Sequence, residues 1–141
     1  MGVGGRLEVT QERINQFADA TLDHQFIHVD PERAARLSPY KTTIAHGFLT
    51  LSLVPHLCQT IPPPCPEAIA GVQMAINYGM DRVRFPSPVK VGSKIRARAE
   101  LLSAELKGPN TIQLKQKVTV EIEGAEKPAC VAEALFRLTY E

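Results

Sequence analysis

Residues 46–59 have the sequence HGFLTLSLVPHLCQ, which is apolar around most of the circumference of a helix. The apolar side chains are Phe48, Leu49, Leu51, Leu53, Val54 and Leu57. A helix that is apolar on nearly all sides has to be buried on nearly all sides. Pro55 lacks a backbone N–H, so we expect it to bend this helix or to tighten its last turn. The segment therefore predicts a long helix at the centre of the fold.

Segments with strand-like alternation follow this helix: residues 72–78, 82–85, 93–106, 112–122 and 129–140. Within the third of them, Ile95 and Ala97 alternate with Arg96 and Arg98, which predicts one apolar and one polar face. The most compact arrangement is a curved antiparallel sheet wrapped around the apolar helix, an α+β fold. The alternative is a closed β-barrel with an appended helical hairpin, which would leave the apolar helix outside.

Two short helices are expected before the central one. Thr10 is a good N-cap, and the apolar spacing that follows it predicts a helix over residues 11–20. Asp30-Pro31-Glu32 supplies the cap, the proline and the first-turn acid of a second helix. Residues 22–29 have no helical period, so we expect an irregular loop between the two helices.

The composition limits the classes of protein to which the chain can belong. With 141 residues, 44% of them hydrophobic, we expect a single domain over residues 1–141. The 16 basic and 15 acidic side chains leave a net charge of +1 and form no basic block, so no nucleic-acid partner is expected. No apolar run approaches the ~20 residues of a membrane span, so no membrane partner is expected either.

The cysteines and the N-terminal residues suggest the compartment. Cys58, Cys65 and Cys130 are an odd number of thiols without the Cys-x-x-Cys spacing. The first residues contain no apolar stretch long enough for a signal peptide. Reduced thiols in a cytoplasmic protein are the simplest interpretation.

Asp23 and His28 are the strongest candidates for chemistry. They lie five positions apart in the irregular segment that is anchored by a predicted helix on each side. Histidine titrates near neutral pH, and a nearby carboxylate can orient its ring and raise its basicity. The alternative is structural: Asp23 would cap the following turn, and His28 would be an ordinary hydrogen-bonded side chain.

His46 and Gly47 begin the predicted central helix. The first backbone N–H groups of a helix have no partner within it, and the positive helix end favours a negative charge. The Gly47 N–H is therefore a candidate donor to an oxyanion. Alternatively, the glycine allows a tight entry or close packing. His46 could act as an acid or base, or its side chain could fix the loop.

Together these groups favour the addition of water next to a carbonyl. Only one short helix and a connector separate the loop of Asp23 and His28 from Gly47, so all three can lie over one cavity. The N–H would polarise the carbonyl group, while the carboxylate and imidazole position a water molecule and transfer its proton.

The sequence resembles the MaoC-like (R)-specific enoyl-CoA hydratases, and most closely their nodulation-protein-N-like branch. The resemblance rests on FADATLDHQFIHVDPERA at residues 17–34 and TTIAHGFLTLSL at residues 42–53. Shorter matches follow at INYG (76–79), DRVRFPSPV (81–89) and GS (92–93).

The resemblance implies a hotdog fold, usually assembled as a homodimer with two sites near the subunit interface. It implies that Asp23 and His28 are the catalytic pair and that Gly47 donates to the oxyanion. The common family loop is Gly-Asp-x-Asn-Pro-x-His; here Leu22 replaces the glycine and Gln25 the asparagine, and phenylalanine stands in place of the proline. Gln25 can still form hydrogen bonds within the loop.

The expected substrate-binding residues are Gln25, His46, Asn77 and Arg84. Arg84 lies among basic residues that could hold the phosphates of coenzyme A, although a solvated strand face would explain them equally well. His24, His28 and the neighbouring aspartates match no standard metal spacing, so no metal is expected.

The predicted activity is (R)-specific hydration of trans-2-enoyl-CoA in fatty acid metabolism, without a metal or redox cofactor. One alternative is an acyl-CoA thioesterase on the same fold, which would use an acidic residue on the central helix. Residues 47–59 contain no Asp or Glu, which argues against it. The other alternative is a non-catalytic module that binds acyl thioesters.

Overall fold

The computed structural model of the protein describes residues 2–64, 67 and 70–141. Its helices are α1 (Gln11–Thr21), α2 (Phe26–Val29), α3 (Pro31–Leu37), α4 (Gly47–Ser52) and α5 (Val54–Gln59). Its strands are β1 (Gly2–Val3), β2 (Leu7–Glu8), β3 (Val72–Arg84), β4 (Lys94–Gly108), β5 (Thr111–Ile122) and β6 (Cys130–Tyr140). Cys65, one of the predicted reduced thiols, lies outside the described residues.

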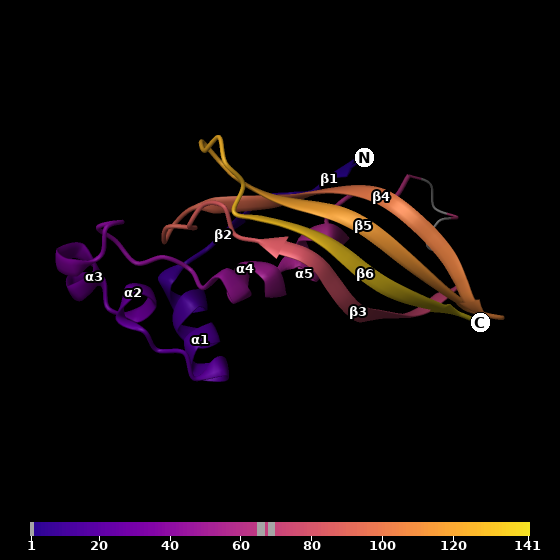
Figure 1. Ribbon diagram of the computed structural model, residues 1–141, viewed down its shortest axis with the longest axis horizontal. Coiled ribbons are helices and arrows are strands. Elements are labelled where there is room, and N and C mark those ends of the chain that lie inside the picture. Colours follow the sequence, from indigo (N-terminus) through magenta and orange to yellow (C-terminus); the bar gives the residue numbers. More distant parts are fainter. Residues whose placement is uncertain (1, 65–66, 68–69) are drawn as a thin grey trace.

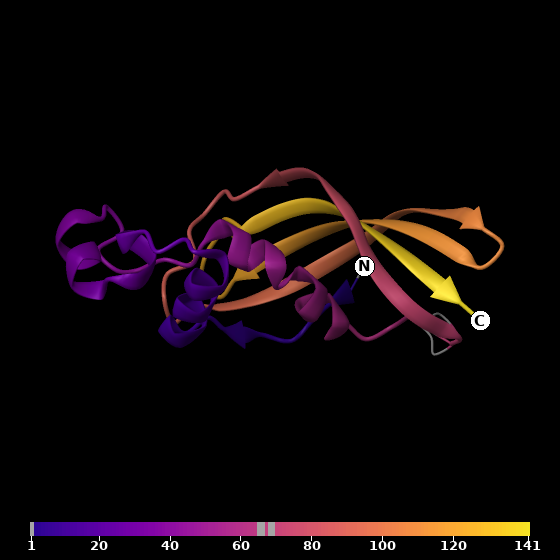
Figure 2. The same cartoon turned by 90° about the horizontal axis from the view of Figure 1, so that it is seen from below.

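The strands form one antiparallel sheet of six strands in the order β1-β4-β5-β6-β3, with β2 also paired to β4. The long strands curve together over α4 and α5, which lie against one face of the sheet (Figures 1 and 2). This is the predicted curved sheet around an apolar helical segment. Because β3 is an edge strand and does not pair with β1, the sheet is open and the β-barrel alternative is wrong.

The central helix differs from the expectation in one respect, because it consists of two short helices. The chain turns at Leu53, between α4 and α5, instead of continuing as one helix over residues 46–59. Pro55 explains the break, since it has no N–H to donate to the carbonyl of Leu51 four residues earlier. The predicted bend at this proline is therefore confirmed.

The core lies between this helical segment and the middle of the sheet. Leu49, Val54 and Leu57 are buried on the helical side. They belong to one hydrophobic cluster that also includes Ile95 on β4 and Val118 on β5. The apolar face predicted for residues 93–106 therefore packs on the helices at Ile95 and Ala97, whereas Leu101 and Leu106 farther along β4 are exposed.

Two further predictions need correction. Residues 22–29 are not wholly irregular, because α2 forms a single helical turn at Phe26–Val29. Residues 72–78 and 82–85 are not separate strands but belong to β3, whose pairing with β6 has three register shifts. Arg82, at the third shift, has a φ of 53°, and the strand continues past this irregularity instead of ending there.

The N-terminal helices form a lobe at one end of the sheet. In Figure 1, α1 lies below the end of the sheet, and α2 and α3 extend beyond it. The Asp30 side chain accepts a hydrogen bond from the Arg33 N–H at 3.1 Å, which confirms the predicted start of α3. None of the described helices has the length and apolar character needed to cross a membrane.

Replacing Leu57 by alanine tests the packing of the core. Leu57 is fully buried on α5, so we expect Leu57→Ala to lower the free energy of unfolding by about 2–5 kcal/mol. Urea denaturation measures this change. The matched control is Leu106→Ala at the far end of β4, where the side chain is 77% exposed. Equal losses in the two variants would contradict the proposed position of the core.

Candidate active site

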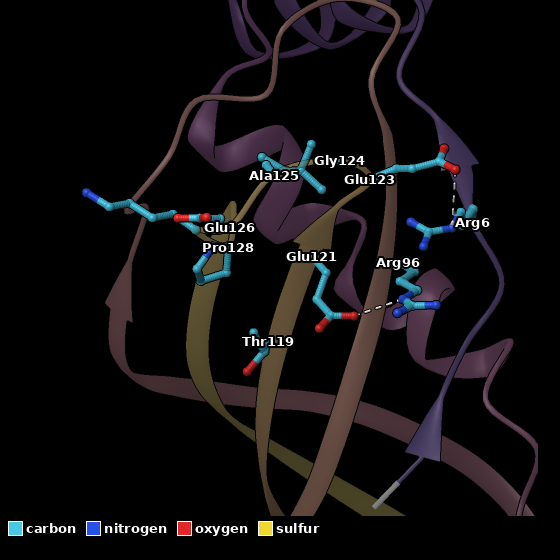
Figure 3. Close-up of a pocket in the computed structure, with 11 residues that line it drawn as sticks. Arg6, Arg96, Thr119, Glu121, Glu123, Gly124, Ala125, Glu126 and Pro128 are labelled. Carbon is cyan, nitrogen blue, oxygen red and sulfur yellow. Dashed lines mark hydrogen bonds and ion pairs between the residues drawn. The ribbon is translucent and has the colours of Figure 1, made fainter.

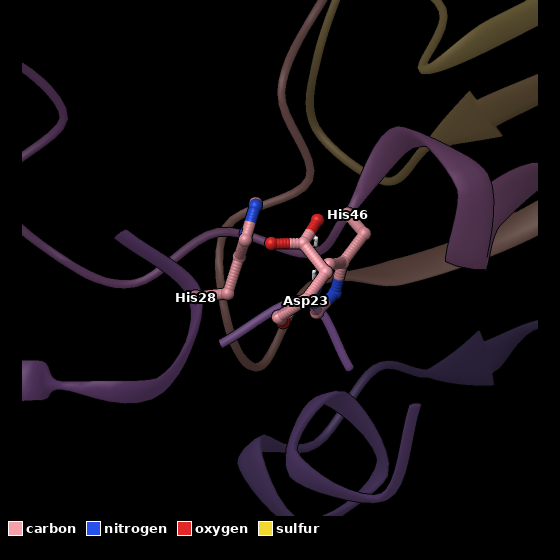
Figure 4. A group of neighbouring side chains, drawn as sticks. All are labelled: Asp23, His28 and His46. Atoms are coloured by element: carbon pink, nitrogen blue, oxygen red, sulfur yellow. Dashed lines mark hydrogen bonds and ion pairs between the residues drawn. The ribbon is translucent and has the colours of Figure 1, made fainter. Parts of the chain in front are cut away.

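Asp23, His28 and His46 meet at the junction between the helical lobe and the central helical segment (Figure 4). Asp23 follows α1, His28 lies in α2, and His46 is the N-cap of α4. One side-chain atom of each residue lies within 4.8 Å of the corresponding atoms of the other two. The structure therefore brings together the two loops that carry the predicted chemical groups.

The loop of Asp23 begins at a residue with unusual backbone geometry. Leu22 ends α1 in the left-handed conformation, with a φ of 67°, and its side chain is 81% exposed. A residue with a Cβ is strained in this conformation by roughly 1–2 kcal/mol, whereas glycine is not. The Gln25 N–H then donates to the Asp23 carboxylate at 3.4 Å, which closes a short turn before α2.

His28 is held in one tautomer by the chain opposite it. Its Nδ1 lies 2.7 Å from the backbone carbonyl oxygen of Ile44. A carbonyl only accepts, so Nδ1 carries the proton and donates it, and Nε2 is left with a free lone pair. The bond thus directs the basic nitrogen of His28 away from the backbone.

The surroundings of His28 favour its neutral form. Burial lowers the pKa of His28 because the charged ring would lose its hydration, while the bond to the Ile44 carbonyl acts in the opposite direction. The neighbouring His46 lowers the pKa further, and the Asp23 carboxylate raises it. The net effect is a lowered pKa, so His28 is available as a base near neutral pH.

A second set of bonds fixes the backbone around His28. Gln11 donates from its side-chain amide to the His28 carbonyl at 2.7 Å and accepts a hydrogen bond from the Thr43 hydroxyl. The Ile44 N–H donates to the Ile27 carbonyl at 3.0 Å. Sequence reasoning missed Gln11 and Thr43, because they lie 17 and 32 residues from their partners and belong to no local pattern.

His46 contacts both members of the predicted catalytic pair and is only 3% exposed. Its Nε2 is 2.9 Å from the backbone carbonyl oxygen of Asp23 and 3.9 Å from the Asp23 carboxylate. Its ring stacks on His28, with centroids 3.8 Å apart and an angle of 23° between the ring planes. A single metal ion cannot lie near the planes of both stacked rings, so joint ligation of a metal would require at least one ring to rotate.

Gly47 packs closely against the Phe85 ring at the start of α4. A Cβ at this position would lie 3.0 Å from the Phe85 ring. The His46 carbonyl accepts from the Leu49 and Thr50 N–H groups in the first turn. Within the described residues no acceptor bonds to the Gly47 N–H, so it is free to bind a ligand oxygen.

The remaining predicted substrate-binding residues are more dispersed. Gln25 lies beside Asp23 in the loop. Asn77 lies on β3 and lines a hollow of about 330 Å³ between β3 and the α4–α5 segment, together with Ser52. Arg84, at the end of β3, donates to the neighbouring Val83 carbonyl at 2.7 Å. No described contact joins Asn77 or Arg84 to Asp23 or His28, so their roles stay predictions.

A second hollow, of about 320 Å³, lies near the β5–β6 turn and is separate from these groups (Figure 3). It is lined by ion pairs between Arg96 and Glu121 at 2.8 Å and between Arg6 and Glu123 at 4.0 Å. Their charges largely compensate one another, so the hollow has no strong preference for an anion or a cation.

Known proteins show the same combination of fold and sequence. A family model described as MaoC like domain matches residues 4–124. The chain is 52% identical over 137 residues to 3-hydroxyacyl-thioester dehydratase Z of Mycobacterium tuberculosis (strain H37Rv), covering 97% of this chain and 87% of that protein. It is 48% identical over 132 residues to nodulation protein N of Rhizobium leguminosarum bv. viciae, covering 94% of this chain and 80% of that protein.

A solved structure supports the same relationship. R-hydratase PhaJ1 from Pseudomonas aeruginosa superposes with a TM-score of 0.70 at 26% identity, over 100% of this chain and 84% of that one. The family model covers most of the chain. The two relatives align with almost the whole chain and are identical to it at about half of the aligned positions. The chain therefore belongs to the MaoC-like dehydratase family and is a hydro-lyase.

Proposed function

We propose that the protein catalyses the reversible syn addition of water to trans-2-enoyl-CoA, which gives (R)-3-hydroxyacyl-CoA. The observation that carries this proposal is the convergence of the Asp23 carboxylate and the free Nε2 of His28 beside the start of α4. The relatives named as a 3-hydroxyacyl-thioester dehydratase and an R-hydratase support the reaction class and its stereochemistry.

In this proposal Gly47 stabilises the enolate, and Asp23 and His28 handle the water and its proton. The Gly47 N–H donates to the thioester carbonyl oxygen and stabilises the enolate that forms when water attacks the β-carbon. Asp23 and His28 hold the water, and His28 Nε2 accepts its proton as the carbon–oxygen bond forms. The pair then delivers a proton to the α-carbon on the same face, which completes the addition. The reaction needs no metal or redox cofactor.

Crotonyl-CoA distinguishes this reaction from its alternatives. Hydration removes the conjugated double bond, so the enoyl absorbance should fall while no free coenzyme A thiol appears. With (R)-3-hydroxybutyryl-CoA the absorbance should rise toward the same equilibrium, and the (S) isomer should be inert because water is held on one face. Thiol release equal to the loss of absorbance would indicate a thioesterase, and binding without either signal would indicate a non-catalytic module.

Substitution of the catalytic pair tests the assigned roles. We expect Asp23→Asn and His28→Ala each to reduce hydration on the order of 10²–10⁴-fold, the usual contribution of acid–base groups. Spectrophotometric rates with crotonyl-CoA measure the loss. Asp19→Asn and His24→Ala are matched controls, because these two exposed side chains pair with each other at 2.9 Å outside the site. Wild-type activity in either catalytic variant would refute the assignment.

We further propose that the protein forms a homodimer through the β3 edge and the adjacent helical segment. Met74, Ile76 and Tyr78 are exposed on β3, and Phe48 on α4 is 69% exposed. An unpaired strand edge flanked by apolar side chains is a pairing surface for another chain. A second copy would also cover the part of the central helix that this sheet leaves exposed.

Sedimentation tests the dimer. We expect a dimer at micromolar concentration in analytical ultracentrifugation, and we expect Ile76→Lys to shift it toward monomer because a charge on a strand edge opposes pairing. Leu106→Lys, at an exposed apolar residue on β4 outside the β3 edge, is the control and should leave the dimer intact. A fully active wild-type monomer would rule out the proposal.

A further inference from the structure

We propose that His46 is a positioning residue for the hydro-lyase reaction, which holds Asp23 through its Nε2–H and holds the His28 ring by stacking on it. This inference deepens the proposed function and rests on the roles given there to Asp23 and His28. His46 itself is buried and makes contact with both catalytic side chains or their backbone, so it acts through them.

The tautomer of His46 follows from its bond to the loop. Its Nε2 is 2.9 Å from the Asp23 carbonyl oxygen, which can only accept. Nε2 therefore carries a proton and donates it. The Asp23 backbone follows the strained Leu22, so this bond fixes the Asp23 backbone relative to the His46 ring that stacks on His28.

The other ring nitrogen of His46, Nδ1, indicates that a histidine at this position does not serve stability alone. Nδ1 is buried and has no hydrogen-bond partner among the described residues. An unsatisfied buried acceptor is unfavourable, so the side chain is not optimised for stability. A purely apolar ring would avoid this cost but would lose the donor to Asp23. A glutamine would keep a donor but lose the ring.

The stack of the two rings is the second contact of His46, because the same side chain supplies both the donor to Asp23 and a ring that packs on His28. His46 covers one face of His28 at a centroid distance of 3.8 Å, and the Phe17 ring packs against His46 with the two ring centroids 4.9 Å apart. The titratable groups that face His28 from the surrounding elements are Asp23 and His46. The cover contributes to the burial that lowers the pKa of His28.

Two substitutions separate the two contacts. His46→Phe keeps an aromatic ring beside His28 but removes the donor to Asp23, so kcat for crotonyl-CoA should fall about 10–100-fold with KM largely unchanged. His46→Gln keeps a donor but removes the ring. Its kcat should fall less, and the acid limb of its kcat/KM profile should move to higher pH, because His28 loses cover and its pKa rises.

His24 provides a matched control for His46. His24→Phe and His24→Gln make the same changes at an exposed histidine of the same loop, and they should leave kcat and the pH profile unchanged. A merely structural role for His46 would lower the melting temperature of both variants while leaving kcat of the folded protein and the pH profile at wild-type values. That result would overturn the proposal.

Nitrogen-15 NMR of the histidine rings in the wild-type protein tests the geometry independently of activity and of variant folding. The proposal requires the Nε2–H tautomer for His46 and the Nδ1–H tautomer for His28 at pH 7. A Nδ1–H tautomer for His46 would contradict it, whatever the kinetic results. If the wild type fails to hydrate crotonyl-CoA, the proposed function falls, while the NMR result still decides how His46 holds the loop.

Discussion

The hydrogen bond from His28 Nδ1–H to the Ile44 carbonyl is the interaction on which the site depends. Residues 43–45 are clamped on the other side by the chain after β3, since Val91 N–H donates to Thr43 O at 3.0 Å and Ala45 N–H to Val89 O at 2.7 Å. The segment is thus a rigid acceptor between the sheet and the helical lobe. Its carbonyl fixes both the ring orientation and the tautomer of His28, and Nε2 becomes the basic atom as a consequence.

The same segment leads directly into the central helix, and this connects the chemistry to the core. His46 and Gly47 follow Ala45 without an intervening loop, so the burial of Leu49 and Leu57 against the sheet also sets the position of the N–H group at the start of α4. A change in core packing is therefore transmitted to the oxyanion donor through the backbone. The Asp23 loop is connected to the core through α1, which carries the buried Ile14, and to α4 through the His46 side chain.

Much of this arrangement could be predicted from sequence, because the relevant signals are local. The caps at Thr10 and Asp30, the apolar circumference of residues 46–59 and the alternation in residues 93–106 each involve neighbouring residues. What could not be predicted involves distant partners. The bonds of Gln11 need the fold to bring three segments together, and β3 continues through its bulge only because β6 pairs with it on both sides of the shift.

Backbone strain on both sides of the α2–α3 segment shows why such distant contacts are necessary. Leu22, between α1 and α2, and Lys41, after α3, both have left-handed backbone, with φ values of 67° and 60°. Neither residue is a glycine, so local preference opposes the turns that place Asp23 and His28 over the central helix. The bonds from Gln11, Ile44 and His46 offset that strain. The geometry of the site is therefore maintained by tertiary hydrogen bonds, and the segment that carries the catalytic pair would not adopt this shape on its own.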